Sequence, residues 1–488
     1  MRTRFLNAMC LIFFCLCLAL SSPAYPVDFD CYSIVVGKDA SSDGYVIMAH
    51  NEDDGPPCVV NHYKVPRKRH FADEKFGLLN GGQIDEAKET YSYIWSEMPG
   101  FLFSDSYINE FGVSVASNAC PSREDIPELT DGGISYNLRK LVVQRCRTAR
   151  DGVLMAGKLV EKFGYDASGR TLIISDPDEG WLYAAVNGKR WVAQRVPDNH
   201  VAIIANTYSI QKIDLSDKVN FLGSPDIIDY AVSRGWYDPE KDGAFDFAAA
   251  YADPAAAVDP TNIGRHWAGL RLLAADQYGF EDNLPFSFEP KSKVDVAMIM
   301  SVLRDHYEGT DIYEPETQYD CSHNRSFGPI CGSDTRTSFI VQLRKNLPLD
   351  IGINYWMCLG SPCISTYIPF YFGIDSFPEG YAGFEDPDEE YYNQKINAPF
   401  AANIDEAFWT FTNCLQKVDS ESHDLLPELR TRIISIETKA LEEQGGFEKE
   451  ILTLYAEDIN SAREMLVLHS NDIYRATIEA MEEVLGAR

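Results

Sequence analysis

The sequence predicts an α+β protein in which groups of strands are separated by pairs of helices. Residues 31–119 alternate short apolar runs with turns such as Ser42-Asp43-Gly44, a pattern typical of strands. Two stretches with apolar residues at helical spacing follow, over Leu138–Cys146 and Val153–Phe163. Strand-like runs then return. This grouping favours layered α+β architecture over alternating βαβ units.

The second half of the chain continues the same pattern and ends in a helical tail. Helices are expected over Phe245–Ala257 and Asp295–Arg304. An acidic stretch at 384–392 then resembles a domain boundary, so we expect a folded body over residues 31–383 and an acidic linker with a helical extension over residues 384–488. The expected strands are Thr171–Ser175, Gly180–Val186, Trp191–Ala193, Val201–Ala205, Thr337–Leu343 and Ile353–Met357.

The first residues have the composition of a secretory leader. Arg2 and Arg4 precede an apolar run over Ala8–Leu20, and Ser22-Pro23-Ala24 offers small residues for cleavage. We therefore predict a signal peptide over residues 1–24, a short propeptide over residues 25–30, and a secreted or periplasmic protein. No later stretch is apolar enough for a membrane helix, so no stable membrane insertion is expected once the leader is removed; an uncleaved anchor is the alternative.

Charge restricts the partners of the chain. The 488 residues contain 43 Lys and Arg against 74 Asp and Glu, which gives a formal net charge of −31. Such a field repels nucleic acid and anionic membranes and favours small or cationic ligands. We expect no nucleic-acid partner. The sequence leaves a homo-oligomer possible.

The cysteine content agrees with export. Without the leader and Cys31, an even number of cysteines remains, so disulfides are expected in an oxidising compartment. Two pairs close in sequence are candidates, Cys321/Cys331 and Cys358/Cys363. The sequence has no tight Cys-x-x-Cys pair and no His-rich tract, and its histidines are scattered. We therefore predict neither a metal nor any other cofactor.

Cys31 is the candidate nucleophile. Cleavage before it would place a thiol and a free α-amine on the same residue, so the amine could accept the proton that the thiol loses. The reference pKa values of the two groups, about 8 and about 8.5, lie close to neutral pH. The alternative is that Cys31 is one half of a structural disulfide.

An ordered set of short motifs follows Cys31, namely Gly37-Lys38-Asp39-Ala40, Ser42-Asp43-Gly44, Asn51-Glu52-Asp53 and Asn109-Glu110-Phe111-Gly112-Val113. With Cys31 at its start, this segment resembles the mature start of the cysteine dipeptidase family of N-terminal nucleophile hydrolases, which includes bacterial dipeptidase A and the secernins. The resemblance continues to about Pro369 and implies a four-layer αββα sandwich for the catalytic domain.

The resemblance also implies roles for further residues. Asn118 and Asn206 each end a strand, where a turn-forming Asn is the ordinary interpretation; the resemblance makes them oxyanion donors. It makes Asp53 the partner of the α-ammonium group of Cys31, and Arg336 a later basic position of the site. His50 stands where relatives often carry arginine, so stabilisation of the thiolate there would depend on pH.

The sequence thus predicts an exported cysteine dipeptidase whose partner is a dipeptide or short peptide. Two alternatives stay open. One is a non-peptide amidase of the penicillin V acylase type, and the other is a catalytically silent, secernin-like binding protein. No Gly-x-Ser-x-Gly elbow, His-Glu-x-x-His zinc helix, Walker loop or Rossmann fingerprint is present in the sequence.

Overall fold

A computed structural model describes residues 31–54, 59–98, 103–313, 323, 327–382, 406–421 and 425–486. The predicted signal peptide, the propeptide, nearly all of the acidic linker and Cys321 lie outside these residues. The predictions for the signal peptide, the propeptide and the linker stay as made from the sequence.

The first of two large sheets carries the start of the described chain at its centre. All its neighbouring strands run antiparallel. Strand β1 lies between β14 and β2, and is therefore shielded on both edges. In spatial order the strands are β16 (Ser287–Phe288), β14 (Val201–Ile204), β1 (Tyr32–Val36), β2 (Val46–Asp53), β17 (Thr335–Leu343), β18 (Ile353–Leu359) and β19 (Ile368–Tyr371).

The second large sheet is also antiparallel and contains the strands predicted between residues 165 and 195. Beside it, two small hairpins pair β4 (Lys68–Arg69) with β7 (Glu89–Thr90) and β5 (Lys75–Gly77) with β6 (Gln83–Asp85). The spatial order of the large sheet is β15 (Phe221–Gly223), β13 (Trp191–Arg195), β12 (Gly180–Gly188), β11 (Tyr165–Ser175), β10 (Ser114–Ala119), β9 (Phe103–Asn109), β8 (Tyr93–Met98) and β3 (Asn61–Val65).

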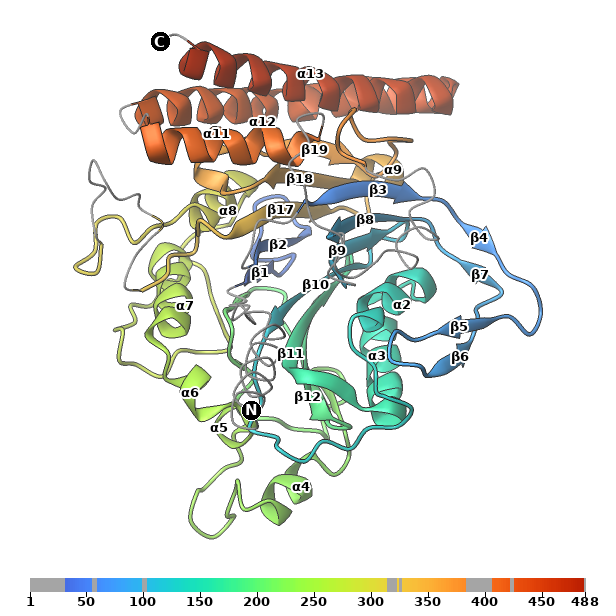
Figure 1. The fold of residues 1–488 in the computed structure, drawn as a ribbon, viewed down its shortest axis with the longest axis vertical. Helices are drawn as coiled ribbons and strands as arrows, with labels where there is room; N and C mark the ends of the chain where they lie inside the picture. Colours follow the sequence, from blue (N-terminus) through green and yellow to red (C-terminus); the bar gives the residue numbers. More distant parts are fainter. Residues whose placement is uncertain are drawn as a thin grey trace, which may run out of the picture.

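The two sheets pack face to face and helices cover their outer faces. Val35 and Met48 of the first sheet share a core with Ile173 and Leu182 of the second. Helices α2 (Asn137–Arg145) and α3 (Ala149–Phe163) cover the outer face of the second sheet, and α7 (Pro260–Leu273) and α8 (Val296–Leu303) that of the first (Figure 1). The predicted four-layer αββα sandwich is confirmed.

The prediction of one continuous helix over Phe245–Ala257 was wrong. The structure has two short helices there, α5 (Phe247–Tyr251) and α6 (Pro254–Ala257). The side chain of Asp253 accepts hydrogen bonds from Ala255 N and Ala256 N, and so starts a new helix. Helix α7 was not predicted. The remaining helices before residue 382 are α4 (Ile227–Ser233), α9 (Leu349–Gly352) and the 3₁₀ helix η1 (Pro362–Ile364).

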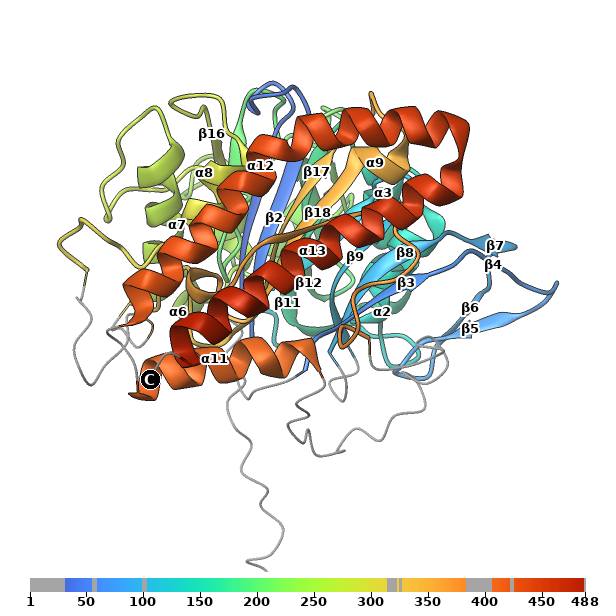
Figure 2. The same cartoon turned by 90° about the horizontal axis from the view of Figure 1, so that it is seen from above.

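The predicted C-terminal helical extension is confirmed by α11 (Ala407–Glu421), α12 (Leu426–Glu457) and α13 (Ile459–Gly486). The three helices lie along β18 and β19 (Figures 1 and 2). Buried charge pairs tie them to the sandwich. Glu437 of α12 accepts a hydrogen bond from Arg304 Nη1 at 2.7 Å and from Tyr367 N at 2.7 Å. No helix in the described ranges combines the length and apolar character needed to cross a membrane.

The predicted Cys358/Cys363 disulfide is not formed. Both cysteines are free thiols, and so is Cys331, whose predicted partner Cys321 lies outside the described residues. Cys358 of β18 packs in the cluster beneath α7 and α8, whereas Cys363 of η1 faces His323. The short distance between them in the sequence does not bring the two sulfur atoms together, because strand and turn direct them differently.

Replacing Glu437 tests how firmly the helical extension is attached. Glu437→Ala leaves Arg304 without its carboxylate partner in a site where Glu437 is only 3% exposed. We expect the free energy of unfolding to fall by about 3 kcal/mol, the range for breaking a buried ion pair. Urea denaturation measures it. Glu442→Ala, an exposed change on the same helix, is the control and should alter stability by less than about 0.5 kcal/mol. Equal effects would contradict the attachment.

Candidate active site

Cys31 lies at the head of β1, in the middle of the first sheet. Ser33 pairs with Ile204 on one side and with His50 on the other. Continuing this register by two residues places Asn206 and Glu52 on either side of Cys31. Its side chain is fully buried. The antiparallel pairing of β1 with β14 and β2 thus brings two distant segments to the thiol.

Two donors from other layers fix the carbonyl group of Cys31. Asn118 Nδ2 of β10 donates to Cys31 O at 2.7 Å and to Ile204 O at 3.3 Å. Arg265 Nη1 of α7 donates to Cys31 O at 3.3 Å. Asn118 therefore comes from the second sheet and Arg265 from the helix layer. The main chain at the nucleophile is held from both sides of its own sheet.

Asn206 has an oriented side chain with an available donor. Its Oδ1 accepts from Arg265 Nη2 at 2.9 Å, and its backbone N–H donates to Asn262 Oδ1 at 3.2 Å. Because Oδ1 of Asn206 faces Arg265, the Nδ2 group of the same amide points in a different direction. This nitrogen is buried and has no hydrogen-bond partner in the described part of the chain. Such an orphan donor is rare in folded proteins and marks a place where a ligand oxygen can bind.

His50 belongs to a chain of hydrogen bonds that ends at Asn118. Ser33 Oγ donates to Asn118 Oδ1 at 2.6 Å and lies 2.7 Å from His50 Nδ1. The hydroxyl has one hydrogen, so Nδ1 carries the hydrogen that Ser33 accepts. His50 Nε2 lies 2.9 Å from Glu52 Oε2. Both ring nitrogens of His50 thus have a partner, Ser33 on one side and Glu52 on the other.

The pKa of the Cys31 thiol does not lie near neutral pH, although the reference value for a free cysteine does. Burial raises its pKa well above the ordinary value, and the negative charges of Glu52, Asp53 and Asp54 raise it further. A thiol in this setting stays protonated at neutral pH. The sulfur therefore needs a base, or a change in its charge environment, before it can attack.

A permanent positive charge stands nearby on β11 instead of at position 50. Burial would lower the pKa of the Arg170 guanidinium, but Tyr165 and Tyr136, followed by Cys31 and Glu52, raise it. Arg170 Nη1 also donates to Ser117 Oγ at 3.1 Å, next to Asn118. Arg170 thus brings a positive charge from the second sheet towards Cys31 and Glu52.

Asp53 and Arg336 meet where β2 pairs with β17. Asp53 Oδ1 accepts from Thr335 Oγ1 at 2.6 Å, and the backbone oxygen of Asp53 lies 3.9 Å from Cys31 Sγ. Arg336 Nη2 donates to Asp54 O at 2.7 Å. Arg336 thus supports the main chain directly after Asp53, and Asp53 lies next to the nucleophile.

Of the five residues predicted to lie near Cys31, the structure places four around it and the fifth, Arg336, one step further out. Several residues that contribute to the site around Cys31 were not predicted from the sequence. One signal for Arg265 was present, because polar residues recur at helical spacing along α7 and their face is buried. The missed residues are Ser33, Glu52, Arg170, Asn262, Arg265 and Thr335.

A cavity of about 700 Å³ lies beside Asn206. Thr207 and Asn262, its neighbours in sequence and in space, line the cavity together with Tyr208 and His266. Acidic residues lie along another part of the wall, namely Asp246, Glu281 and Asp282. The volume suits a small ligand, and the wall favours one with a positive charge.

Cys31, His50 and Glu52 could also be considered as metal ligands, because their ligand atoms lie within 4.8 Å of one another. The hydrogen-bond chain argues against this use. Both ring nitrogens of His50 already face partners, Ser33 and Glu52, and a metal ligand needs an exposed lone pair.

The four-layer fold with a cysteine at the head of a central strand is the fold of N-terminal nucleophile hydrolases. Comparison with known families is more specific: residues 30–425 match the family described as peptidase family C69, and the chain belongs to this family. This confirms the resemblance to cysteine dipeptidases and the predicted class of enzyme, a cysteine-type peptidase.

The relatives found by sequence agree with this assignment. The chain is 24% identical to a "probable dipeptidase B" of Streptococcus pyogenes over 94% of this chain and 92% of that protein. It is 28% identical to a "probable dipeptidase" of Latilactobacillus sakei, over 72% and 76% of the two chains. A mutant of conjugated bile acid hydrolase from Clostridium perfringens is 12% identical, with a TM-score of 0.34 over 67% of this chain and 89% of that chain.

The charge of Glu52 should control the ionisation of Cys31. Glu52→Gln removes the largest of the charges that raise the pKa of the thiol, so this pKa should fall. The pH at which iodoacetamide alkylates Cys31 at half its maximal rate should therefore move down. Mass spectrometry of the Cys31 peptide follows the rate. Asp178→Asn, a remote exposed change, is the control. An unchanged midpoint would show that Glu52 does not act on the thiol.

Proposed function

We propose that this protein is an exported cysteine dipeptidase that hydrolyses short peptides with Cys31 as its nucleophile. Membership of peptidase family C69 supports the peptidase class, and the family match begins one residue before Cys31. The observation that carries the proposal is the position of Cys31, buried at the head of β1 beside the orphan donor of Asn206. The names of the relatives suggest dipeptides as substrates.

Removal of residues 1–30 would supply the base that the thiol needs. The new α-amine of Cys31 accepts the proton of its own thiol as sulfur attacks the peptide carbonyl carbon. This proton then passes to the leaving amine, and water hydrolyses the remaining thioester. Asp53 would be the partner of the α-ammonium state, because its carboxylate is close enough to Cys31 to raise the pKa of the thiol. The raised pKa of the buried thiol makes such an intramolecular base necessary.

The oxyanion that forms during attack would bind Asn206 Nδ2. This N–H group is neutral, oriented by Arg265 and already withdrawn from water, which is the arrangement that stabilises a developing negative charge. Asn118 has a different part. Its Nδ2 is engaged with Cys31 O and Ile204 O, so it positions the nucleophile and could reach a substrate oxygen only by rearranging.

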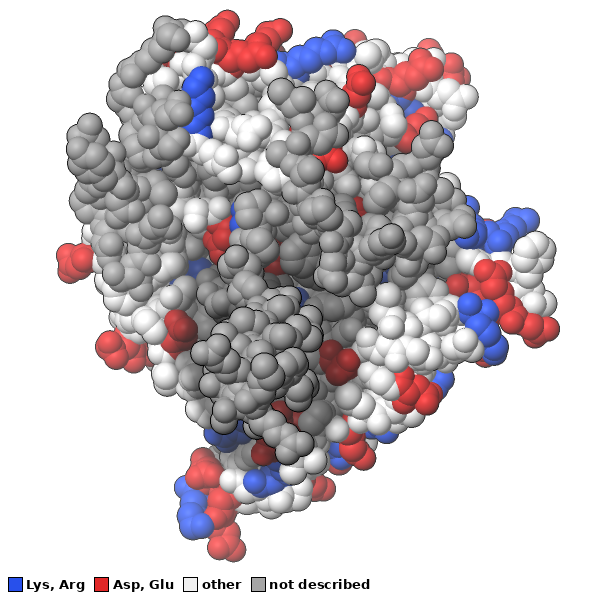
Figure 3. Space-filling model, in the orientation of Figure 1, with Lys and Arg blue, Asp and Glu red and all other residues white. Residues whose placement is uncertain are grey.

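The cavity beside Asn206 is the proposed substrate site. Its volume of about 700 Å³ suits a dipeptide or a slightly longer peptide. The acidic wall, which includes Asp246 and Asp282, favours a substrate with a free ammonium group. Figure 3 shows acidic and basic side chains interspersed around one face, and with a net charge of −31 the surface favours neutral or cationic substrates over nucleic acid.

Maturation is the first test of the proposal. The secreted protein should begin at Cys31, which N-terminal sequencing and intact mass can show. Cys31→Ala should lose turnover while keeping its fold, and Cys31→Ser should turn over much more slowly, because a hydroxyl ionises far less readily than a thiol. A stable, active protein that begins at Tyr25 would overturn the mechanism. So would wild-type activity in Cys31→Ala.

A substrate panel separates the dipeptidase from other hydrolases. The mature protein should release amino acids from dipeptides and act poorly on penicillin V, bile-salt conjugates and acyl-homoserine lactones. The panel includes dipeptides with free and with acetylated amino ends. Preference for the free amino end would support the acidic wall as its binding place. Cleavage of a non-peptide amide alone would overturn the peptide substrate, and no turnover at all would favour a binding protein.

Asn206 should affect the rate more than the binding of substrate. Asn206→Ala removes the proposed oxyanion donor, so kcat should fall by about 10²–10³ while KM changes little. Steady-state kinetics on the best dipeptide measures both constants. Asn199→Ala, an exposed change on the loop before β14, is the matched control. A rise in KM with an unchanged kcat would show that Asn206 binds the ground state instead.

A further inference from the structure

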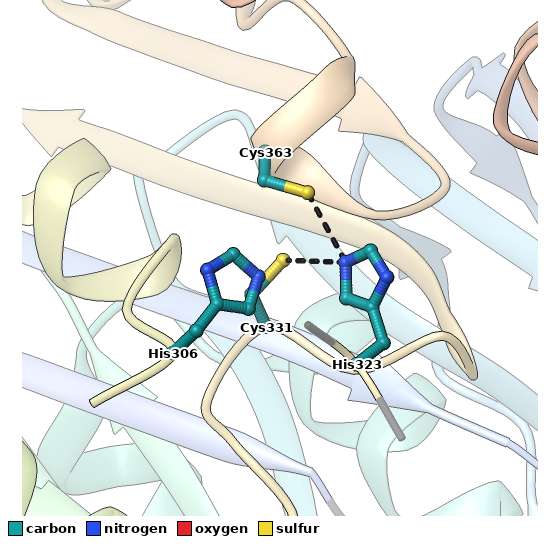
Figure 4. Close-up of side chains that lie close together, drawn as sticks. All are labelled: His306, His323, Cys331 and Cys363. Atoms are coloured by element: carbon teal, nitrogen blue, oxygen red, sulfur yellow. Dashed lines mark hydrogen bonds between the residues drawn. The ribbon is translucent and has the colours of Figure 1, made fainter. Parts of the chain in front are cut away.

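Four side chains that the proposed mechanism does not use meet in the interior. His306, His323, Cys331 and Cys363 are all buried, and their ligand atoms lie within 4.8 Å of one another. Figure 4 shows both sulfur atoms and both rings converging on one point. His306 follows α8, Cys331 precedes β17, and Cys363 lies in η1. Segments between residues 306 and 363 thus join here.

The distances within the cluster match a tetrahedral site. His323 Nε2 lies 3.1 Å from Cys363 Sγ and 3.7 Å from Cys331 Sγ. Zinc binds sulfur at about 2.3 Å and imidazole nitrogen at about 2.0–2.1 Å, which places neighbouring ligands of a tetrahedron about 3.4–3.8 Å apart. Small shifts of the side chains are enough to reach this geometry.

His306 is prepared to act as a ligand. Its Nδ1 lies 3.0 Å from Glu308 Oε1, and its backbone N–H donates to Glu308 Oε2 at 2.8 Å. The carboxylate places the ring hydrogen on Nδ1 and so leaves a lone pair on Nε2. This Nε2 atom is buried and lacks a conventional hydrogen-bond partner within the described ranges. A carboxylate behind the histidine is the usual support of a metal ligand.

We propose that His306, His323, Cys331 and Cys363 bind one divalent metal ion in a closed structural site, with Zn²⁺ the ion that fits best. Two thiolates and two neutral imidazoles form the Cys₂His₂ set that zinc prefers, and together with Zn²⁺ they carry no net charge, which suits a buried position. The sequence analysis predicted no metal because it required closely spaced cysteines. These four ligands are spread from residue 306 to residue 363.

The site would brace the strand next to the nucleophile. Asn51 Nδ2 of β2 donates to Leu303 O at 3.1 Å and to Ile330 O at 2.9 Å. Strand β2 is thus hydrogen-bonded to the two segments that lead into His306 and Cys331. Thr335, four residues after Cys331, holds Asp53. The metal would fix these segments to one another from outside the active site.

A disulfide between Cys331 and Cys363 competes for the same atoms, since the chain is expected to be exported. Both thiols are free in the structure. A disulfide would have no use for two histidines aimed at the sulfur pair, whereas a metal uses all four groups. The two alternatives differ in metal content and in the chemistry of the thiols, so one experiment separates them.

The test measures metal in the full secreted protein, produced with zinc in the medium and then desalted. Elemental analysis should find about one zinc per chain. Cys363→Ser and His306→Ala should lose it, whereas Cys414→Ser, a buried free thiol on α11, should keep it. Cys31→Ala should keep it as well, which separates this cluster from the group around the nucleophile. A chelator should lower Tm, and added Zn²⁺ should restore it.

If the variants of the metal ligands fail to fold, measurements on the wild-type protein still test the metal site. Zinc should protect Cys331 and Cys363, but not Cys31, from alkylation in the native protein. Co²⁺ in place of zinc should give thiolate-to-cobalt charge-transfer absorption. Metal content at background level with unprotected thiols would overturn the proposal. So would a Cys331–Cys363 disulfide in non-reducing peptide maps of the secreted protein.

Discussion

The fixation of the Cys31 main chain is the constraint on which the site depends. Its carbonyl oxygen accepts hydrogen bonds from Asn118 of the second sheet and from Arg265 of the helix layer. Strand β1 itself is held on both edges by β14 and β2. Three of the four layers of the sandwich therefore converge on one peptide group. This arrangement gives the residue that carries the thiol a defined position in the sheet.

The same packing places negative charges close to the buried thiol of Cys31. Three consecutive acidic residues, 52–54, surround a buried thiol and raise its pKa. Glu52 is paired with the ring of His50, and Arg170 adds a permanent positive charge from the second sheet. These groups offset part of the negative charge at the site. Burial and the remaining negative charge keep the thiol of Cys31 protonated at neutral pH.

Polar contacts also connect β2 to the loops and helices outside the site. Asn51 links β2 to the ends of two loops, and the cluster of His306, His323, Cys331 and Cys363 ties those loops together. On the outer side, Glu437 joins α12 to Arg304 beside the same loops. The C-terminal helices thus stabilise the part of the molecule that holds β2 and β17 in place.

The sequence by itself determined the strands, the class of fold and the position of Cys31, because period-two apolar runs and an ordered motif are local signals. It also identified Asn118, Asn206, Asp53 and His50, which end or interrupt strands near that motif. It could not assign their contacts. Arg265 reaches Cys31 only because α7 packs over β14, and the four ligands of the proposed metal site meet only when loops far apart in the chain come together. Tertiary structure decided these features, since side-chain distances between remote segments depend on packing and on register, which no local pattern contains.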